Sequence, residues 1–372
     1  MKKVIVAGAG ILGASTAYHL AKDGAEVIIV DRFDEGQATD SAAGMICPWL
    51  SQRRNKAWYQ LAKGGARYFP DLVQQLAGDG EENTGYYRSG TLFVHSDKEK
   101  LEKKIKMAEK RREDAPEMGE ITSLSPEETQ RYFPPLKEGY HGVLVSGGAR
   151  VDGRAMRKAL IRGAARHGAV FVEGDATLTF DGNRVTGVQV NDETFEADEV
   201  VVTAGAWSKD MVKPLGIDLD ITYQKGQVVH LEIPGVETHQ WPVIMPPNDQ
   251  HILAFESGRI VIGATHEDDT GLDVRVTAGG VSEVLGKALD VAPGLSESTI
   301  MDTRTGFRPY TPGSLPVIGP LPGFEGIYLA NGLGASGLTS GPYLGRELAK
   351  LVLHKQTEID ISLYDVKGAI QT

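Results

Sequence analysis

The chain contains a single cysteine, Cys47, among its 372 residues, which excludes a disulfide within the chain. Such sparing use of cysteine is typical of proteins in reducing compartments. No stretch reaches about 18 consecutive apolar residues, so the sequence predicts no transmembrane segment. The apolar run that follows Lys3 is broken by glycines within a few residues, which argues against a signal peptide. We therefore expect a cytoplasmic protein.

Basic residues are outnumbered by acidic ones. Lys and Arg number 39 against 50 Asp and Glu, and the resulting net charge of −11 predicts no nucleic-acid partner. The nine histidines show neither H-E-x-x-H nor another ligand spacing, so no metal site is expected. The apolar content of 41% and charged content of 24% are ordinary for a globular chain, and the length predicts about two domains.

Glycine, in contrast, is abundant. It accounts for 45 of the 372 residues, or 12%, against a usual share of about 7%. No G-X-Y period runs through the chain, so a collagen-like structure is excluded. A glycine excess in a globular chain indicates many places where the backbone turns tightly or approaches another group closely.

The first cluster of glycines forms the motif G-x-G-x-x-G at residues 8–13. Residues 3–7 before it are typical of a buried strand, residues 14–22 after it of a helix, and residues 26–30 of a second strand that leads into Asp31. This strand–turn–helix–strand context with an acidic residue 18 positions past Gly13 predicts a dinucleotide site.

Each part of this motif has a physical role. The first glycine allows the tight turn, the second lets a pyrophosphate approach the backbone, and the third lets the helix pack closely on the strand. The pyrophosphate would lie at the helix N-terminus, and the carboxylate would accept hydrogen bonds from ribose hydroxyls. The candidate cofactor-binding residues here are Gly8, Gly10, Ile11, Leu12, Gly13, Asp31 and Arg32. By itself the motif does not separate NAD from FAD.

The rest of the chain alternates between helical and strand patterns. Helices are predicted at residues 57–76, 97–120, 152–167, 281–291 and 341–354. Strands are predicted at 170–173, 177–180, 187–191, 199–203, 227–232, 251–255, 259–262 and 326–330. Because the α/β character of the beginning returns at the end, we expect the nucleotide domain to be discontinuous in sequence.

Four further segments follow the opening motif in order: residues 38–46 (ATDSAAGMI), 202–208 (VTAGAWS), 306–319 (GFRPYTPGSLPVIG) and 332–345 (GLGASGLTSGPYLG). Together the five motifs closely resemble the FAD-dependent D-amino acid oxidase superfamily, above all its glycine oxidase and D-amino acid dehydrogenase branches. The resemblance covers nearly the whole chain. It implies an α/β fold, α+β overall, with a Rossmann-type FAD-binding domain and a β-sheet-rich substrate domain. The implied boundaries are residues 1–75, 146–218 and 302–372 for the former and 76–145 and 219–301 for the latter.

The resemblance also implies which residues bind the flavin. The loop that follows Asp31, the acidic residue expected to bind the ribose, would pass between the pyrophosphate and the isoalloxazine. A strand end near residue 204 would lie beneath the cofactor. The turn at residues 332–339 would face the pyrimidine edge of the flavin. The implied positions are Ser41, Ala42, Ala43, Gly44, Met45, Thr177, Ala204, Gly205, Trp207, Gly334, Ala335, Ser336, Gly337, Leu338 and Thr339. No cysteine follows Cys47, whereas monomeric sarcosine oxidases attach flavin through a later one, so non-covalent FAD is favoured.

For the substrate, the resemblance implies that Arg308 in the motif GFRP pairs with a carboxylate, which suits a planar guanidinium. His251 lies where glycine oxidases tend to place a tyrosine, and it is open whether it touches substrate; Tyr310 and Tyr223 are weaker candidates. Residues 225–227 resemble a turn between the domains. The implied reaction is hydride transfer from the α-carbon of a D-amino acid, glycine or N-alkyl amino acid to flavin N5. Its products would be a 2-oxo acid, ammonia or an amine, and H2O2.

Three alternatives stay open at this point. A dehydrogenase would pass electrons from the same substrates to a quinone or carrier protein instead of O2. An NAD-dependent enzyme would be colourless, and a non-catalytic flavoprotein subunit would hold flavin that no amino acid bleaches. The turn at 333–338 (LGASGL) is uncharged where glycine oxidase has an arginine, which weighs against strict glycine oxidase activity. A role in amino acid catabolism and a homo-oligomer are both compatible with the sequence.

Overall fold

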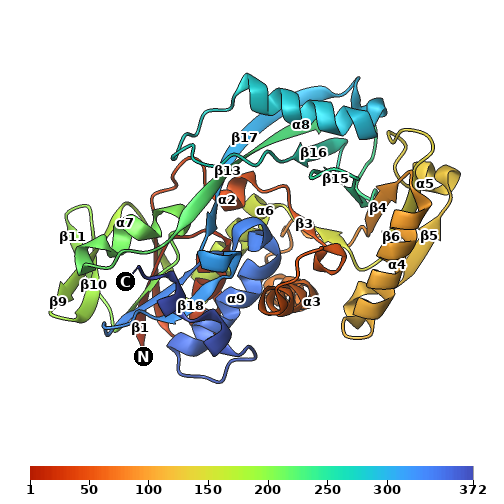
Figure 1. Ribbon diagram of the computed structural model, residues 1–372. Coiled ribbons are helices and arrows are strands. Elements are labelled where there is room, and N and C mark those ends of the chain that lie inside the picture. The colour runs from red at the N-terminus through yellow and green to blue at the C-terminus, as the bar shows by residue number, and fades with distance from the viewer. Residues whose placement is uncertain (372) are drawn as a thin grey trace.

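The computed structural model describes residues 1–371, and a six-stranded sheet forms its first layer (Figure 1). Five neighbouring strands of this sheet are parallel, and the sixth, at one edge, is antiparallel. In sheet order the strands are β18 (Val317–Pro320), β19 (Ile327–Asn331), β12 (Glu199–Val202), β1 (Lys3–Ala7), β2 (Glu26–Asp31) and β8 (Val170–Glu173). Strands from the two ends of the chain, β1 and β19, therefore flank β12 in one sheet.

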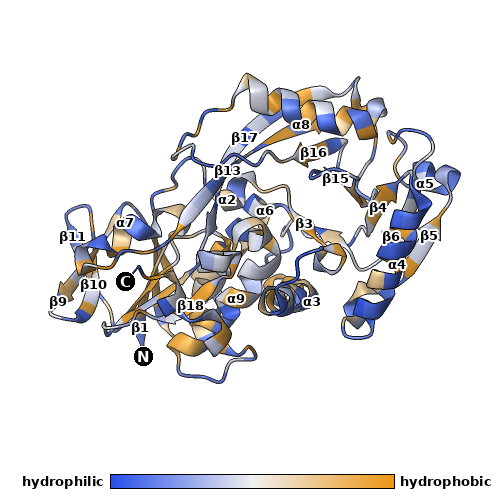
Figure 2. Ribbon diagram, in the orientation of Figure 1, coloured by the Kyte–Doolittle hydropathy of each residue, from blue (hydrophilic) through white to orange (hydrophobic). Residues whose placement is uncertain are grey.

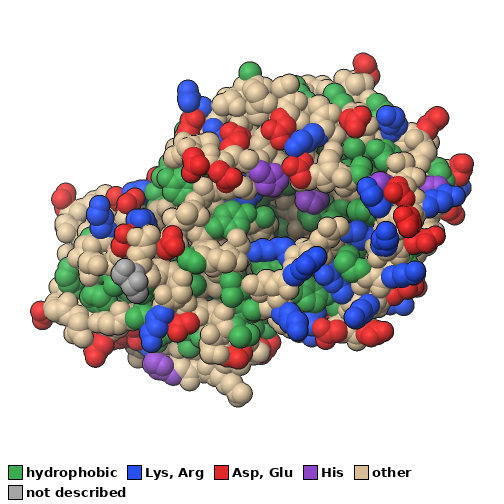
Figure 3. All heavy atoms as spheres, in the orientation of Figure 1, with side chains coloured by type: hydrophobic (Ala, Val, Ile, Leu, Met, Phe, Trp, Pro, Cys, Tyr) green, Lys and Arg blue, Asp and Glu red, His purple; other side chains and the backbone are tan. Residues whose placement is uncertain are grey.

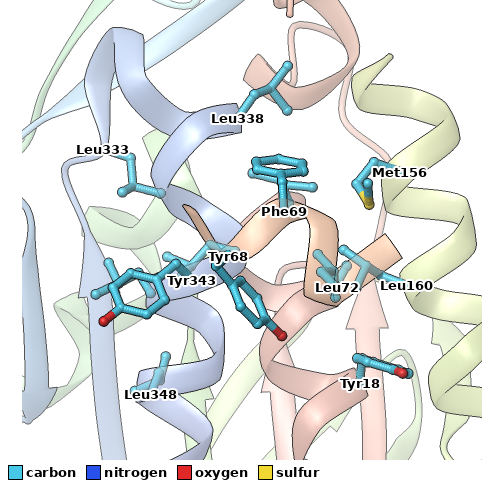
Figure 4. Close-up of a cluster of buried hydrophobic side chains, with 14 of the residues drawn as sticks. Tyr18, Tyr68, Phe69, Leu72, Met156, Leu160, Leu333, Leu338, Tyr343 and Leu348 are labelled. Atoms are coloured by element: carbon cyan, nitrogen blue, oxygen red, sulfur yellow. The ribbon is translucent and has the colours of Figure 1, made fainter. Parts of the chain in front are cut away.

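One face of this sheet is covered by a helical layer. Its members are α1 (Ile11–Lys22), α3 (Lys56–Gly78), α6 (Gly153–Arg166) and α9 (Gly337–Val352). Figure 4 shows their apolar side chains meeting in one cluster, in which Tyr18, Phe69, Leu160 and Tyr343 come from four different helices. Small residues allow the helices to approach: a Cβ on Gly345 of α9 would lie 2.8 Å from the Leu12 carbonyl oxygen of α1. Burial of this apolar cluster holds the glycine motif and the last helix in one rigid layer.

An eight-stranded sheet forms the second large layer (Figure 1). Its strands in order are β17 (Thr299–Tyr310), β13 (Thr222–Glu232), β16 (Arg259–Gly263), β15 (His251–Ala254), β14 (Val243–Met245), β4 (Thr91–His95), β6 (His141–Val145) and β5 (Ile121–Leu124). Helix α8 (Ala278–Val291) packs on β13 and β16, while α4 (Lys98–Arg112) and α5 (Pro126–Tyr132) pack at the other end. The outer helix α4 is mostly hydrophilic, in contrast to the apolar strands of the first sheet (Figure 2).

Smaller elements complete the chain. A three-stranded antiparallel sheet contains β9 (Ala176–Asp181), β10 (Arg184–Val190) and β11 (Glu193–Glu196), and β3 (Met45–Ile46) pairs with β7 (Ala149–Arg150). The short helices are α2 (Ala38–Ser41) and α7 (Ser208–Val212). Turns of 3₁₀ helix lie at Pro48–Leu50, Pro116–Met118, Gly205–Trp207, Lys213–Leu215, Pro293–Leu295, Pro312–Ser314, Gly334–Ser336, Ile361–Tyr364 and Val366–Ala369. Within residues 1–371, no helix is both long enough and apolar enough to cross a membrane.

The α/β fold class is confirmed, but two details differ from the sequence-based expectations. The predicted boundary at residue 302 lies inside β17, so the segment with Arg308 continues a strand of the eight-stranded sheet. The turn predicted at residues 225–227 is wrong, because these residues lie within β13 and pair with β17. The absence of a side chain at Gly226 leaves room for the Arg308 guanidinium. The helix predicted at 97–120 ends at Arg112, before Pro116.

Candidate active site

One cavity of about 500 Å³ opens at the carboxyl ends of the five parallel strands. The residues at or just past these ends, Ala7, Asp31, Gly174, Thr203 and Asn331, all line it. The opposite wall comes from the eight-stranded sheet, and the space-filling view shows a hollow on this face of the molecule (Figure 3). Ligands of open parallel sheets bind at this edge, so the cavity is the candidate active site.

At one end of the cavity lies the glycine motif. Gly8 has φ +101°, and a Cβ there would lie 2.7 Å from the backbone of Thr203. A Cβ on Gly13 would lie 1.8 Å from the carbonyl oxygen of Gly8, so only glycine allows α1 to begin this close to β1. Gly10 provides no side-chain cap for α1, Thr39 Oγ1 accepts a hydrogen bond from Ile11 N at 2.9 Å, and Gly10, Ile11 and Leu12 line the cavity. The positive end of the helix dipole therefore lies at the cavity, where it favours an anion.

Asp31, at the end of β2, accepts hydrogen bonds that stabilise the turn of the glycine motif. One carboxylate oxygen, Oδ2, accepts a hydrogen bond from Ala9 N at 2.5 Å, and Oδ1 accepts from Phe33 N at 2.6 Å and Gln37 Nε2 at 2.9 Å. Asp31 also lines the cavity, so its carboxylate both holds the motif and faces the position expected for a ribose. The neighbouring Arg32 lines the cavity and forms ion pairs with Asp34 at 2.6 Å and Asp175 at 2.8 Å.

Farther along, the cavity is bordered by the turn that precedes α9. Gly332 and Gly334 have positive φ values of +83° and +51°. A Cβ on Gly334 would lie 2.3 Å from the Tyr310 ring. No side chain caps α9 at Ser336, and Gly337, Leu338 and Thr339 line the cavity. A second helix N-terminus is thus directed to the same cavity as the first.

Most of the residues predicted to bind cofactor line this one cavity. They are Gly8, Gly10, Ile11, Leu12, Asp31, Arg32, Ser41, Ala42, Ala43, Gly44, Met45, Thr177, Ala204, Gly205, Trp207, Gly334, Ala335, Gly337, Leu338 and Thr339. Gly13 and Ser336 are not among the lining residues, because Gly13 packs against Gly8 and the Ser336 hydroxyl bonds to Leu333 O and Trp58. Of the predicted substrate residues, Arg308 and His251 line the cavity, whereas Tyr310 lies beside Gly334 and Tyr223 packs on Phe307.

Arg308 projects from β17 over β13. Its Nη1 donates to Gln224 Oε1 and to the carbonyl oxygen of Thr265, both at 3.1 Å. The guanidinium lies above Gly226, where a Cβ would be only 2.6 Å from Nη2, which explains a glycine in the middle of a strand. Among the described residues no carboxylate forms an ion pair with Arg308, and burial lowers its pKa. A partly buried cation with neutral partners is a good receptor for an anion.

Two histidines lie at the same end of the cavity. His251 begins β15 and is partly buried; burial, with the nearby His266 and Arg308, lowers its pKa to about 4. His266 follows Thr265, and burial likewise lowers its pKa. Sequence reasoning missed His266, Gln224 and Thr265 as site residues. Their one signal was closeness to the ends of predicted strands, which becomes informative only once the strand pairing is known.

Comparison with known proteins agrees with this geometry. A family model described as FAD dependent oxidoreductase matches residues 3–351 of the chain. The chain belongs to this family.

Several relatives of this oxidoreductase align over nearly their full length. It is 59% identical over 371 residues to the uncharacterized oxidoreductase YurR of Bacillus subtilis, covering 100% of both chains. It is 42% identical to the crystal structure of iminodiacetate oxidase from Chelativorans sp. BNC1, with a TM-score of 0.94 and coverage of 97% and 98%. It is 27% identical over 379 residues to glycine oxidase of Pseudomonas putida, covering 99% of each chain.

The cavity of this FAD-dependent oxidoreductase fits its cofactor. Small residues line the wall at Ala42–Gly44, at Ala204 and Gly205, and at Gly332 and Gly334 on either side of Leu333. Two helix N-termini open into the cavity, that of α1 at the glycine motif and that of α9. FAD has an anionic pyrophosphate and a ring that becomes more negative on reduction, so these two ends match its chemistry.

Proposed function

We propose that this oxidoreductase oxidises the CH–NH bond of a small amino acid and passes the electrons to O2. The observation that carries the proposal is Arg308, a partly buried guanidinium with neutral partners at the end of the cofactor cavity. The names of two relatives, iminodiacetate oxidase and glycine oxidase, support it, since both name amine-bearing carboxylates. Candidate substrates are therefore glycine, D-amino acids and N-alkyl amino acids, including N-carboxymethyl compounds.

In this proposal, bound FAD supplies the two-electron acceptor. Arg308 binds the substrate carboxylate through its fork and fixes the α-carbon against the cofactor. The cationic side chain also lowers the pKa of the nearby amine, so the amine loses a proton to water before oxidation. The α-C–H bond then breaks, two electrons leave with the hydrogen, and the nitrogen lone pair forms a C=N bond.

Water completes the reaction. It adds to the C=N carbon, and the C–N bond breaks to release a 2-oxo acid and ammonia or, from an N-alkyl substrate, an amine. The two electrons and two protons reduce O2 to H2O2. Arg308 is partly buried, so its charge pairing with the substrate carboxylate is stronger than it would be in bulk water.

We further propose that the FAD is held without a covalent bond through cysteine. The only cysteine, Cys47, is buried and does not line the cavity, and burial raises the pKa of its thiol to about 11. A thiol kept protonated and away from the cofactor does not attach to it. Acid precipitation of the purified protein should therefore release all of the yellow colour into the supernatant, whereas retention in the pellet would contradict this proposal.

The substrate proposal is tested by anaerobic bleaching of the flavin. Glycine, N-methylglycine, iminodiacetate, both enantiomers of alanine and both enantiomers of proline are mixed with the holoenzyme, and absorbance near 450 nm is followed. At least one should bleach the flavin, and air should then restore the colour within seconds, with one H2O2 per turnover. Slow recovery in air would favour a dehydrogenase that uses a quinone or carrier protein. Absence of bleaching by every compound would overturn the proposed function.

A further inference from the structure

The substrate end of the cavity carries three nitrogen-bearing side chains, which come from β17, from the start of β15 and from the segment just after β16. Arg308 of β17 donates a hydrogen bond to the carbonyl oxygen of Thr265, and His266 is the next residue along the chain. His251 pairs with Gly263 where β15 lies beside β16. Gly263 in turn precedes His266 by three positions along the chain. Both histidines and Arg308 line the cavity. In the space-filling view, histidine side chains border the hollow (Figure 3).

The carboxylates near these side chains form hydrogen bonds mainly with other residues. Asp249 accepts hydrogen bonds from Lys287 at 2.9 Å and 3.1 Å, and it lies 3.7 Å from His266. Glu283 bonds to the same lysine at 2.8 Å. Glu267 accepts from Gln227 Nε2 at 2.7 Å and Thr265 Oγ1 at 2.5 Å, and does not line the cavity. The two imidazoles therefore have no carboxylate committed to them alone.

Arg308 by itself accounts for one substrate carboxylate. The two histidines exceed what a glycine or N-methylglycine molecule needs, because such substrates bring no second anion. A side chain that is uncharged when buried becomes a strong partner for a carboxylate when it takes up a proton. His251 and His266 are thus suited to a second anionic group on the same substrate.

We propose that His251 and His266 form a second carboxylate site facing Arg308, and that the preferred substrates are amino acids whose nitrogen carries a carboxyalkyl group. This inference rests on the proposed function and narrows its substrate class. Arg308 binds the carboxylate beside the carbon that is oxidised, and the histidine pair binds the carboxylate on the other arm. From iminodiacetate, loss of two electrons and a proton forms the C=N bond, and hydrolysis yields one glyoxylate and one glycine without ammonia.

The binding part of the inference is tested with two ligands that lack the amine. Oxydiacetate carries two carboxylates around an ether oxygen, and methoxyacetate differs from it by the absence of one carboxylate. Binding to the FAD-loaded enzyme is measured from the perturbation of flavin absorbance, a readout independent of turnover. Oxydiacetate should bind about tenfold or more tightly than methoxyacetate, the gain expected of a charge-assisted contact.

Variants assign that preference to the histidines. The His266 side chain is 42% exposed. In His266→Asn the preference for oxydiacetate over methoxyacetate should fall to about threefold or less. His251→Asn should lower it similarly, and its FAD content and circular dichroism report whether it folds. His239→Asn is the matched control, because His239 does not line the cavity, and it should keep the full preference.

Proton uptake gives a second measurement. Burial and the nearby Arg308 disfavour protonation of His251 and His266, and Lys287 adds to this at His266, whereas Asp249 favours protonation of both and Glu283 that of His266. A second substrate carboxylate would favour protonation further. The affinity for oxydiacetate should fall as the pH rises from 6 to 9, whereas that for methoxyacetate should change much less. The variants at 251 and 266 should flatten the oxydiacetate profile.

The outcomes separate the two proposals. Equal binding of the two ligands, or an unchanged preference in both histidine variants, would overturn the second carboxylate site. If glycine or N-methylglycine still bleached the flavin, the proposed function would stand without it. A clear preference for oxydiacetate that depends on the histidines would support the site even if no amine in the panel were oxidised, and in that case the proposed function alone would fail.

Discussion

The indole Nε1 of Trp58 donates a hydrogen bond of 3.0 Å to Ser336 Oγ, although 278 positions separate the two residues. Ser336 in turn donates to the carbonyl oxygen of Leu333 at 2.8 Å. The Trp58 ring is covered by the guanidinium of Arg53 at 4.5 Å. The first turn of α3 is thereby tied to the turn before α9, which borders the cofactor cavity. Trp58 is thus a positioning residue for that turn.

Replacing this indole tests the positioning role. Trp58→Phe removes the donor while keeping an aromatic ring, so the turn at 334–336 loses a restraint worth about 1 kcal/mol. The FAD dissociation constant, measured by recovery of flavin fluorescence, should rise about fivefold. Trp241→Phe, which changes a tryptophan that packs on Phe133 in the apolar cluster beside the eight-stranded sheet, should leave FAD affinity unchanged. An unaltered FAD affinity in Trp58→Phe would contradict a role for the Trp58–Ser336 hydrogen bond in positioning this turn.

Arg308→Lys tests the carboxylate receptor. Lysine keeps the positive charge but loses the planar fork, so kcat/KM for an amino acid that bleaches the flavin should fall about 30-fold or more. The FAD content should not change. Arg304→Lys is a matched control on the same strand, because Arg304 bonds to Asp302 at 2.6 Å and does not line the cavity. Equal kcat/KM in Arg308→Lys and the native enzyme would remove Arg308 from substrate binding.

Gly13→Ala tests the close approach of α1 to β1. The added methyl carbon would lie 1.8 Å from Gly8 O and 2.5 Å from Thr203 Oγ1, so the helix must shift. We expect the free energy of unfolding to fall by about 1–3 kcal/mol and FAD binding to weaken strongly. Gly286→Ala in α8 is the control, because nothing lies within 4 Å of its added carbon. Helix propensity predicts that the free energy of unfolding of the control rises by up to about 1 kcal/mol. Equal changes in unfolding free energy and FAD binding in the two variants would contradict a packing requirement for glycine at position 13.

His19 makes stability depend on pH. It is buried in α1 beside Tyr68, with 2.8 Å between its Nε2 and the Tyr68 hydroxyl, and burial lowers its pKa to about 3. Since the unfolded chain binds this proton near pH 6.5 and the native protein does not, stability falls as the pH drops from about 6.5 toward 3. The contribution of His19 is at most about 1.4 kcal/mol per pH unit.

Urea unfolding at pH 7, 6, 5 and 4 measures this dependence. The difference in unfolding free energy between the native protein and His19→Gln should shrink or reverse as the pH falls. His141→Gln, which changes a histidine on β6, should follow the native protein at every pH. Parallel curves for the native protein and His19→Gln would contradict the buried neutral state.

The parts of the cofactor site that could be predicted from the sequence are those whose chemistry is local. Gly8, Gly10 and Gly13 stand within six residues, and the strand and helix that flank them have clear periodicity. The order of the later motifs then indicated that distant segments meet at one flavin. The adjacency of β12, β1 and β19 agrees with this interpretation.

The parts that were missed depend on strand pairing and on side-chain direction. Residues 225–227 resemble a family turn, yet they lie within β13, and the Arg308 guanidinium above Gly226 explains a glycine in this strand. Ser336 belongs to a motif that borders the cavity, yet its hydroxyl bonds to Trp58 instead. His266 and Gln224 carry no sequence pattern of their own, since their positions follow from the register of β13, β16 and β17.

The cavity wall draws on segments from both ends of the chain. It begins at Ala7 and ends at Thr339; β1 gains its neighbour β12, and β12 gains β19, only when these later segments have been made. A nascent chain that has emerged only as far as β17 would lack the final turn and α9, and so would hold FAD poorly. We therefore expect tight FAD binding only once the chain has been made through α9, when early and late segments can contact the cofactor together.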